Sequence, residues 1–82
     1  MKSYADVMNL CAEIFRTVFS EPQLSVMATT SASDIAEWDS LAQITLLMSM
    51  EQTFEIKFSL DEVEGLQNVG EIVELILVKV NK

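Results

Sequence analysis

Three segments of this chain repeat their apolar residues at the spacing of an α-helix, and this feature constrains the fold more than any other. In the first segment the apolar positions follow i, i+3, i+4, i+7 and i+11, and they hold Val7, Leu10, Cys11, Ile14 and Val18. Such a stripe predicts a helix with one buried face. The helix is predicted to begin near Ser3 or Tyr4. Since Pro22 disfavours the helical conformation at Glu21, the helix should end at about Ser20.

The second helical segment, predicted from about Ser40 to Thr53, is apolar around most of its circumference. One row holds Ile44, Leu47, Met48, Glu51 and Phe54, and a neighbouring row holds Leu46 and Met50. Most of these positions are expected in the core. A helix that is apolar nearly all round must also face a second apolar surface. One interpretation is therefore a helical adaptor, unmodified, that docks a partner helix or groove.

The chain after this helix is expected to form a connection and a short helix. Residues 54–58, FEIKF, alternate as a strand does, but no second good strand is present to pair with them. We therefore expect an extended connection with apolar anchors. Residues 59–62, SLDE, match a capping box, and the short helix that they open should end at Gly65.

The last helical segment begins at Asn68, an N-cap residue that is followed three positions later by Glu71. Its apolar stripe holds Val69, Ile72, Val73, Ile76 and Val80. Lys79 and Lys82 lie at its C-terminal end, where cations are favoured. The stretch LILVKV is rich in β-branched residues and leaves a strand open as an alternative.

A long segment from Pro22 to Trp38, rich in Ser, Thr and Ala and without a clear period, joins the first two helices. Such loops are usually functional or pinned to the core. The apolar residues that could anchor this one are Leu24, Val26, Ile35 and Trp38. Residues 29–33, TTSAS, are expected to be its most exposed part. The predicted fold is all-α: a four-helix bundle with three longer helices, one short helix and this loop, in a single domain over residues 1–82.

The charge balance and the absence of histidine exclude several functions. Five Lys and Arg oppose thirteen Asp and Glu, so a net charge of −8 repels nucleic acid and anionic membranes and favours partners with basic patches. Without His, the commonest general base and metal ligand are missing, so neither an enzyme nor a metal site is expected. The single Cys11 permits no internal disulfide, and burial is the favoured interpretation.

No segment has the pattern of a targeting or membrane element. Asp6, Asn9 and Glu13 interrupt the first apolar stretch before it could act as a signal-peptide core, and no run approaches the length of a membrane span. We expect a cytoplasmic protein that is not inserted in a membrane and is a monomer.

Ser40 permits two interpretations. Residues 40–43, SLAQ, match an S-x-x-Q capping box, and spacing alone favours Ser40 as the helix cap. Asp39 is an equally good cap and adds negative charge at the positive end of the helix. In that case Ser40 is the first helical residue and its hydroxyl points to solvent. A phosphate ester on that hydroxyl would lie beside free N–H groups of the helix.

The sequence around this serine resembles a known family. The stretch WDSLAQI, followed by F-x-I-x-F and NVGEIVELI, is similar to the attachment motif and helix order of acyl carrier proteins and related peptidyl carriers. The resemblance covers roughly residues 4–80. It implies that a phosphopantetheinyl transferase moves 4′-phosphopantetheine from coenzyme A onto Ser40, within the motif formed by Asp39, Ser40 and Leu41. Acyl intermediates would then be carried as thioesters on this arm.

The resemblance also implies which residues meet partner enzymes. Leu41, Thr45, Met48 and Glu51 are expected on the partner-facing side of the second helix, for acyl-activating and acyl-transferring enzymes with basic or apolar docking patches. The positions expected nearer the core are Ile44, Leu47, Met50 and Phe54.

One departure from the family concerns acidic residues. Fatty-acid carriers place acids along the second helix, where this chain has the neutral Ala42, Thr45 and Gln52. We therefore expect a discrete carrier of a specialised lipid or polyketide-type pathway. An aminoacyl or peptidyl carrier is the alternative within the carriers, and the unmodified adaptor is the alternative outside them.

Overall fold

The computed structural model describes residues 2–81, and these residues form four helices and no strand. The helices are α1 (Tyr4–Val18), α2 (Ser40–Phe54), α3 (Leu60–Glu64) and α4 (Val69–Val80). The all-α prediction with one short helix is confirmed. Residues 55–59 form an extended connection, as predicted, whereas the strand alternative for LILVKV is wrong because these residues belong to α4. Lys82 lies outside the described residues.

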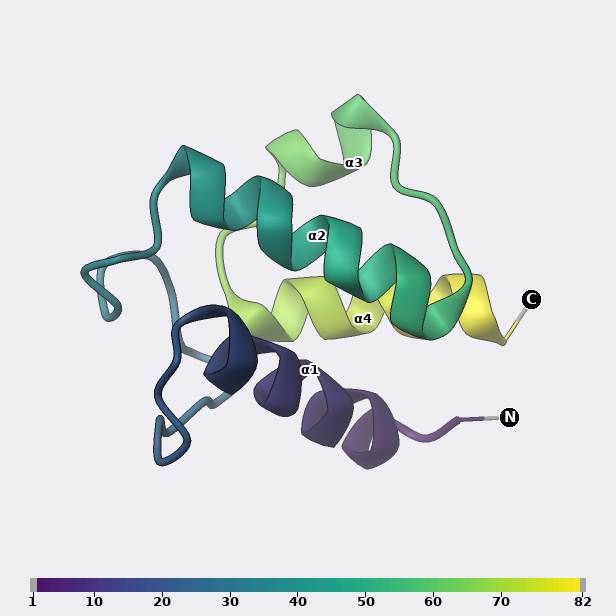
Figure 1. The fold of residues 1–82 in the computed structure, drawn as a ribbon. Helices are drawn as coiled ribbons and strands as arrows, with labels where there is room; N and C mark the ends of the chain where they lie inside the picture. The colour runs from purple at the N-terminus through teal and green to yellow at the C-terminus, as the bar shows by residue number, and fades with distance from the viewer. Residues whose placement is uncertain (1, 82) are drawn as a thin grey trace.

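The helices form a small bundle in which α1 packs against both α2 and α4. Figure 1 shows the short α3 on the side of α2 away from α1, and the loop between α1 and α2 at the end of the bundle opposite the termini. The terminal segments are joined by two hydrogen bonds of 3.1 Å each between the backbone of Lys2 and the side-chain amide of Asn81. None of the helices formed by residues 2–81 is long and apolar enough to cross a membrane.

Helix α1 begins and ends through local backbone chemistry. Ser3 caps it in a box with Asp6: the Ser3 hydroxyl accepts from the Asp6 N–H, and the Asp6 carboxylate accepts from the Ser3 N–H. The helix ends at Val18, two residues before the predicted end. Ser20 adopts a left-handed conformation with φ 55°, so the Glu21 N–H turns back to the carbonyl of Arg16 at 2.9 Å. The helix therefore ends in a Schellman-type turn, before it reaches the residue at which Pro22 disfavours the helical conformation.

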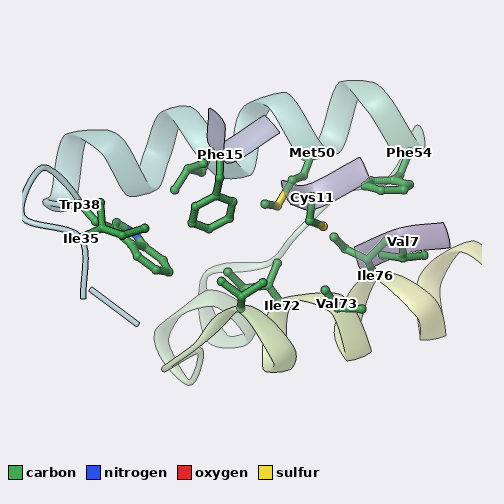
Figure 2. Packing of buried hydrophobic residues seen from close by; sticks show 12 residues of the cluster. Val7, Cys11, Phe15, Ile35, Trp38, Met50, Phe54, Ile72, Val73 and Ile76 are labelled. Carbon is green, nitrogen blue, oxygen red and sulfur yellow. The ribbon is translucent and has the colours of Figure 1, made fainter. Parts of the chain in front are cut away.

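The core is built from one face of each long helix together with the loop (Figure 2). From α1 it receives Val7, Cys11 and Phe15, all with no exposed surface. These residues are spaced four apart and therefore lie in one row along α1. Of the predicted stripe, Leu10, Ile14 and Val18 are only half-buried and pack at its edge.

Helix α2 contributes a second row with the same four-residue spacing: Leu46, Met50 and Phe54. The prediction for Met50 and Phe54 is confirmed, and Leu47 is half-buried against the same cluster. The prediction for Ile44 is wrong, since 55% of its surface is exposed. Because the buried row runs through positions 46, 50 and 54, Ile44 lies on the opposite side of the helix.

The loop between α1 and α2 is pinned at both of its ends. Ile35 and Trp38 are buried in the core, as predicted, and Leu24 and Val26 are half-buried against it. The expectation that residues 29–33 are the most exposed part is wrong for Thr30, which is only 8% exposed. The Thr30 hydroxyl accepts from the Met27 N–H at 2.9 Å, which folds the loop into a tight turn.

This turn docks on the first residues of α4. The carbonyl oxygens of Thr30 and Ala28 accept from the N–H groups of Val69 and Gly70 at 2.9 and 2.8 Å. A Cβ atom at Gly70 would lie 3.0 Å from the Ala28 oxygen, so a side chain here would force the loop to shift. The start of α4 is therefore capped by the loop as well as by its own N-cap, Asn68, whose side chain accepts from the Glu71 N–H.

Candidate functional site at the start of helix α2

Asp39, and not Ser40, caps helix α2. Asp39 has the extended conformation of an N-cap (φ −104°, ψ −170°), and its carboxylate accepts from the Ala42 N–H at 2.9 Å. The interpretation of Ser40 as the cap is therefore wrong, and the S-x-x-Q box is not formed. Ser40 is the first helical residue and is exposed. Within residues 2–81 its hydroxyl takes part in no hydrogen bond, so its oxygen is free.

Gln43, the last residue of the expected box, is bound elsewhere. Its side-chain oxygen accepts a hydrogen bond of 2.6 Å from the indole N–H of Trp38. The Trp38 ring is 9% exposed and stands edge-on to Phe15, with the ring centroids 5.0 Å apart and the planes at 81°. Two hydrogen bonds therefore fix the start of α2, one between Asp39 and Ala42 and one between Trp38 and Gln43.

An open groove of about 490 Å³ begins at Asp39 and Ser40. It runs between the first turn of α2 and the segment that joins α3 to α4. Besides Asp39 and Ser40, its polar lining residues include Gln43, Gln67 and Asn68, which carry side-chain amides. Ile44, Leu66 and Ile72 are among its apolar lining residues. The groove can therefore hold an elongated group with both amide and aliphatic parts, attached at its mouth.

The side of α2 that faces away from the core is also apolar. Leu41, Ile44 and Met48 are 72%, 55% and 54% exposed, and Thr45 is exposed between them. We call these four residues the outer face of α2. Three of them, Leu41, Thr45 and Met48, are residues that the sequence assigned to partner binding. Ile44 was missed, although it lies one helical turn from both Ser40 and Met48.

Glu51, the fourth residue assigned to partner binding, has a structural contact. Its carboxylate accepts from the backbone N–H of Phe58 at 2.8 Å, and its side chain is half-buried. It therefore fastens the connection between α2 and α3 to the side of α2. Glu51 is the only acidic residue within α2, one helical turn beyond Met48, and this hydrogen bond engages its carboxylate.

The described residues offer neither a reactive thiol nor a cluster of metal ligands. Cys11 has no exposed surface, and burial raises the pKa of its thiol to about 12, so it stays protonated and unreactive at neutral pH. Among residues 2–81, no three His, Cys, Asp or Glu side chains cluster as metal ligands do.

Comparisons with known proteins agree on one family. The family described as "Phosphopantetheine attachment site" matches residues 7–76. An acyl carrier protein of Kineococcus radiotolerans is 30% identical over 76 residues, which cover 93% of this chain and 94% of the relative. An acyl carrier protein of Acidothermus cellulolyticus is 30% identical over 74 residues, covering 90% and 88%.

A solved structure agrees in fold as well. The solution structure of holo acyl carrier protein from Geobacter metallireducens superposes with a TM-score of 0.86 at 37% sequence identity, over 92% of this chain and 86% of that one. The family match includes most of α1, all of α2 and α3, and the larger part of α4. The chain therefore belongs to the acyl carrier protein family, whose covalently attached cofactor is 4′-phosphopantetheine, and it is a carrier and not an enzyme.

Proposed function

We propose that the 4′-phosphopantetheine of this carrier is attached to the hydroxyl of Ser40, within a motif formed by Asp39, Ser40 and Leu41. The observation that supports this most strongly is the Asp39 cap, which leaves the Ser40 oxygen exposed and without a hydrogen bond. In a serine that capped its own helix, the hydroxyl oxygen would instead be turned toward the backbone N–H groups of the first turn.

The residues around Ser40 fit the chemistry of this group. The backbone N–H groups of Ser40 and Leu41, at the start of α2, have no acceptor within residues 2–81 and are suited to a phosphodiester. Next to them, the amides of Gln43, Gln67 and Asn68 line a groove that suits the amide groups of a pantetheine chain. When bound, the group supplies a terminal thiol that carries the acyl cargo as a thioester.

We place this carrier, a single domain over residues 1–82, in the cytoplasm as a monomer. Its first partner is a phosphopantetheinyl transferase that uses coenzyme A. Its other partners are acyl-activating and acyl-transferring enzymes. The net charge of −8 favours basic docking patches on these enzymes and disfavours nucleic acid.

We assign the carrier to a specialised lipid or polyketide-type pathway because of the outer face of α2. Leu41 and Met48 give partners an apolar contact, with the neutral Thr45 between them and Glu51 as the only acidic residue within the helix. Glu51 contributes through its bond to Phe58, which fixes the end of this surface. Apolar anchors near the centre of an interface carry most of its binding free energy. The cognate enzymes should therefore dock through apolar pockets, with their basic residues around the rim.

An aminoacyl or peptidyl cargo is the second candidate, because the polar amides of the groove suit a polar cargo as well as the arm. Loading assays with adenylating and acyl-activating enzymes on the modified protein separate the two, since each enzyme transfers only its own class of cargo. The adaptor alternative rests on the same exposed Leu41 and Met48. It predicts partner binding that neither coenzyme A nor Ser40→Ala affects.

The attachment is tested by incubating the unmodified protein with coenzyme A and a broad-range transferase and measuring its intact mass. We expect one added phosphopantetheine. Ser40→Ala should remain unmodified. Ser59→Ala is the matched control, because Ser59 is also followed by leucine at a helix start, and it should be modified as the wild type is. A wild-type chain that stays unmodified while a known carrier is converted would contradict the proposal.

A further inference from the structure

Two overlapping helix starts compete at residues 39–43. In one, Asp39 is the cap, as the structure has it. In the other, Ser40 is the cap of an S-x-x-Q box: its hydroxyl would accept from the Gln43 N–H, and the Gln43 side chain would accept from the Ser40 N–H. Only the first leaves the Ser40 hydroxyl free. Whatever favours the first start therefore favours modification of Ser40.

The chain itself contains the second kind of start, at α3. Ser59 and Leu60 repeat the Ser-Leu pair of residues 40 and 41. There the Ser59 hydroxyl accepts from the Glu62 N–H at 3.2 Å, and the Glu62 carboxylate accepts from the Ser59 N–H at 2.8 Å. The residue before Ser59 is Phe58, which has no capping side chain. A Ser-Leu start in this protein thus closes into a box when nothing prevents it.

At α2, Trp38 keeps the last residue of the box away from Ser40. The indole N–H holds the Gln43 oxygen at 2.6 Å, and that oxygen is the acceptor that the box would need. The ring is not free to follow Gln43, because it is buried against Phe15. The bond to Trp38 therefore holds the Gln43 side chain in a position other than the one that the box needs.

We infer that the hydrogen bond from Trp38 to Gln43 selects the helix start that leaves the Ser40 hydroxyl free, which makes Trp38 a positioning residue for modification of Ser40. The inference rests on the proposed attachment at Ser40. Breaking the bond from the Trp38 side releases Gln43 to form the box. Breaking it from the Gln43 side removes the box as well. The two sides of one bond therefore have different effects on modification.

The test measures kcat/KM for transfer of phosphopantetheine to three variants: Trp38→Phe, Gln43→Met and the double variant. Trp38→Phe should lower kcat/KM by up to about five-fold, the population change produced by one hydrogen bond. Because Gln43 also lines the groove beside Ser40, Gln43→Met has a reference value of its own, but its loss should be smaller than that of Trp38→Phe. The double variant should be modified faster than Trp38→Phe alone. Gln52→Met, an exposed Gln-to-Met change near the other end of α2, controls for the substitution itself.

Trp38→Phe also removes core volume, so thermal unfolding is followed for every variant. Since Trp38 is the only tryptophan, a synthetic chain with benzothienylalanine at this position keeps the ring shape and lacks the N–H. This chain should show the same loss as Trp38→Phe without the cavity.

Three results separate the possible failures. A wild-type chain that is not modified contradicts the proposed attachment itself. A modified wild type with equal losses for Trp38→Phe, Gln43→Met and the double variant overturns the inference, because a purely structural bond would be equally damaged from either side. Unchanged kcat/KM in Trp38→Phe and in the benzothienylalanine chain also overturns it.

Discussion

Two helix starts with the same Ser-Leu pair fold differently in this protein. At α3, Ser59 caps the helix and its hydroxyl is occupied by the Glu62 N–H. At α2, Ser40 lies one position inside the helix and its hydroxyl has no partner within residues 2–81. The leucines that follow the two serines are both 72% exposed, so burial does not separate the two sites.

The difference comes from the residues before each serine. Asp39 can cap, whereas Phe58 cannot, and Trp38 holds the side chain that would complete a box with Ser40. A serine at a helix start is therefore available for modification when its neighbours perform the capping. The following predictions test this difference between the two helix starts, in order of decreasing effect.

The largest expected effect concerns thiols, because the chain's own thiol is buried and the carried one is exposed. Burial raises the pKa of Cys11 to about 12, so the folded, unmodified protein should show no reactive thiol with a disulfide reagent at pH 8. After modification, one reactive thiol should appear, and unfolding should expose a second. A fast-reacting thiol in the folded, unmodified protein would contradict the burial of Cys11.

The next effect tests the loop that leads into Asp39. Gly70→Ala should destabilise the protein by about 1–3 kcal/mol, because its Cβ would meet the Ala28 oxygen at 3.0 Å and the Ala28 Cβ at 3.2 Å. Gly65→Ala, just after α3, is the matched control. Its nearest contact is the Glu62 oxygen at 4.0 Å, so it should gain about 0.4–1 kcal/mol. Chemical denaturation measures the free energy of unfolding of both variants. Equal changes would show that the loop does not pack closely against α4.

A smaller effect on the free energy of unfolding is expected when each of the two serines is replaced by alanine. Ser59→Ala removes a helix cap and should lower the free energy of unfolding by about 1 kcal/mol. Ser40→Ala removes a side chain that caps nothing, so its change should be only about a few tenths of a kcal/mol. Denaturation midpoints at a common slope give the comparison. A larger loss for Ser40→Ala than for Ser59→Ala would mean that Ser40 caps α2 in solution.

The smallest effect depends on pH and concerns Glu62, which belongs to the capping box at the start of α3 and not to the start of α2. Its bond from the Ser59 N–H, and then its 2.9 Å ion pair with Lys79, lower the pKa of this carboxyl below its usual 4.5. A lowered pKa stabilises the folded state above pH 4.5, and this contribution disappears as the pH falls through the lowered value. The difference in melting temperature between the wild type and Glu62→Gln should therefore shrink from pH 6 to pH 3. A constant difference would contradict it.

Much of the fold could be predicted from the sequence because its signals are local. The period of apolar residues identified the three longer helices, and the capping residues Ser59 and Asn68 gave the starts of α3 and α4. The end of α1 was placed two residues late because the turn depends on Ser20 adopting a positive φ, which no proline rule indicates. The burial of Thr30 follows from its turn docking on α4, a contact between distant segments that periodicity does not contain.

The candidate site was less predictable, because two of its features depend on which of two alternatives forms. These features are the residue that caps α2 and the row of α2 that faces the core. Spacing alone favoured Ser40 as the cap, whereas in the structure Asp39 caps the helix and Gln43 is bound to Trp38. On the apolar helix α2, spacing could not say which row faces the core. Leu46 and Ile44 are both apolar, yet Leu46 is fully buried and Ile44 is 55% exposed. The packing of α1 against one side of α2 decides between them.

The most direct test of the account localises the attached arm by fragmenting the modified protein in a mass spectrometer. Ser40 and Ser59 provide an internal comparison, since each is exposed and begins a Ser-Leu pair. We expect one phosphopantetheine on Ser40 and none on Ser59. An arm on any other residue, or a chain that a competent transferase leaves unmodified, would contradict it.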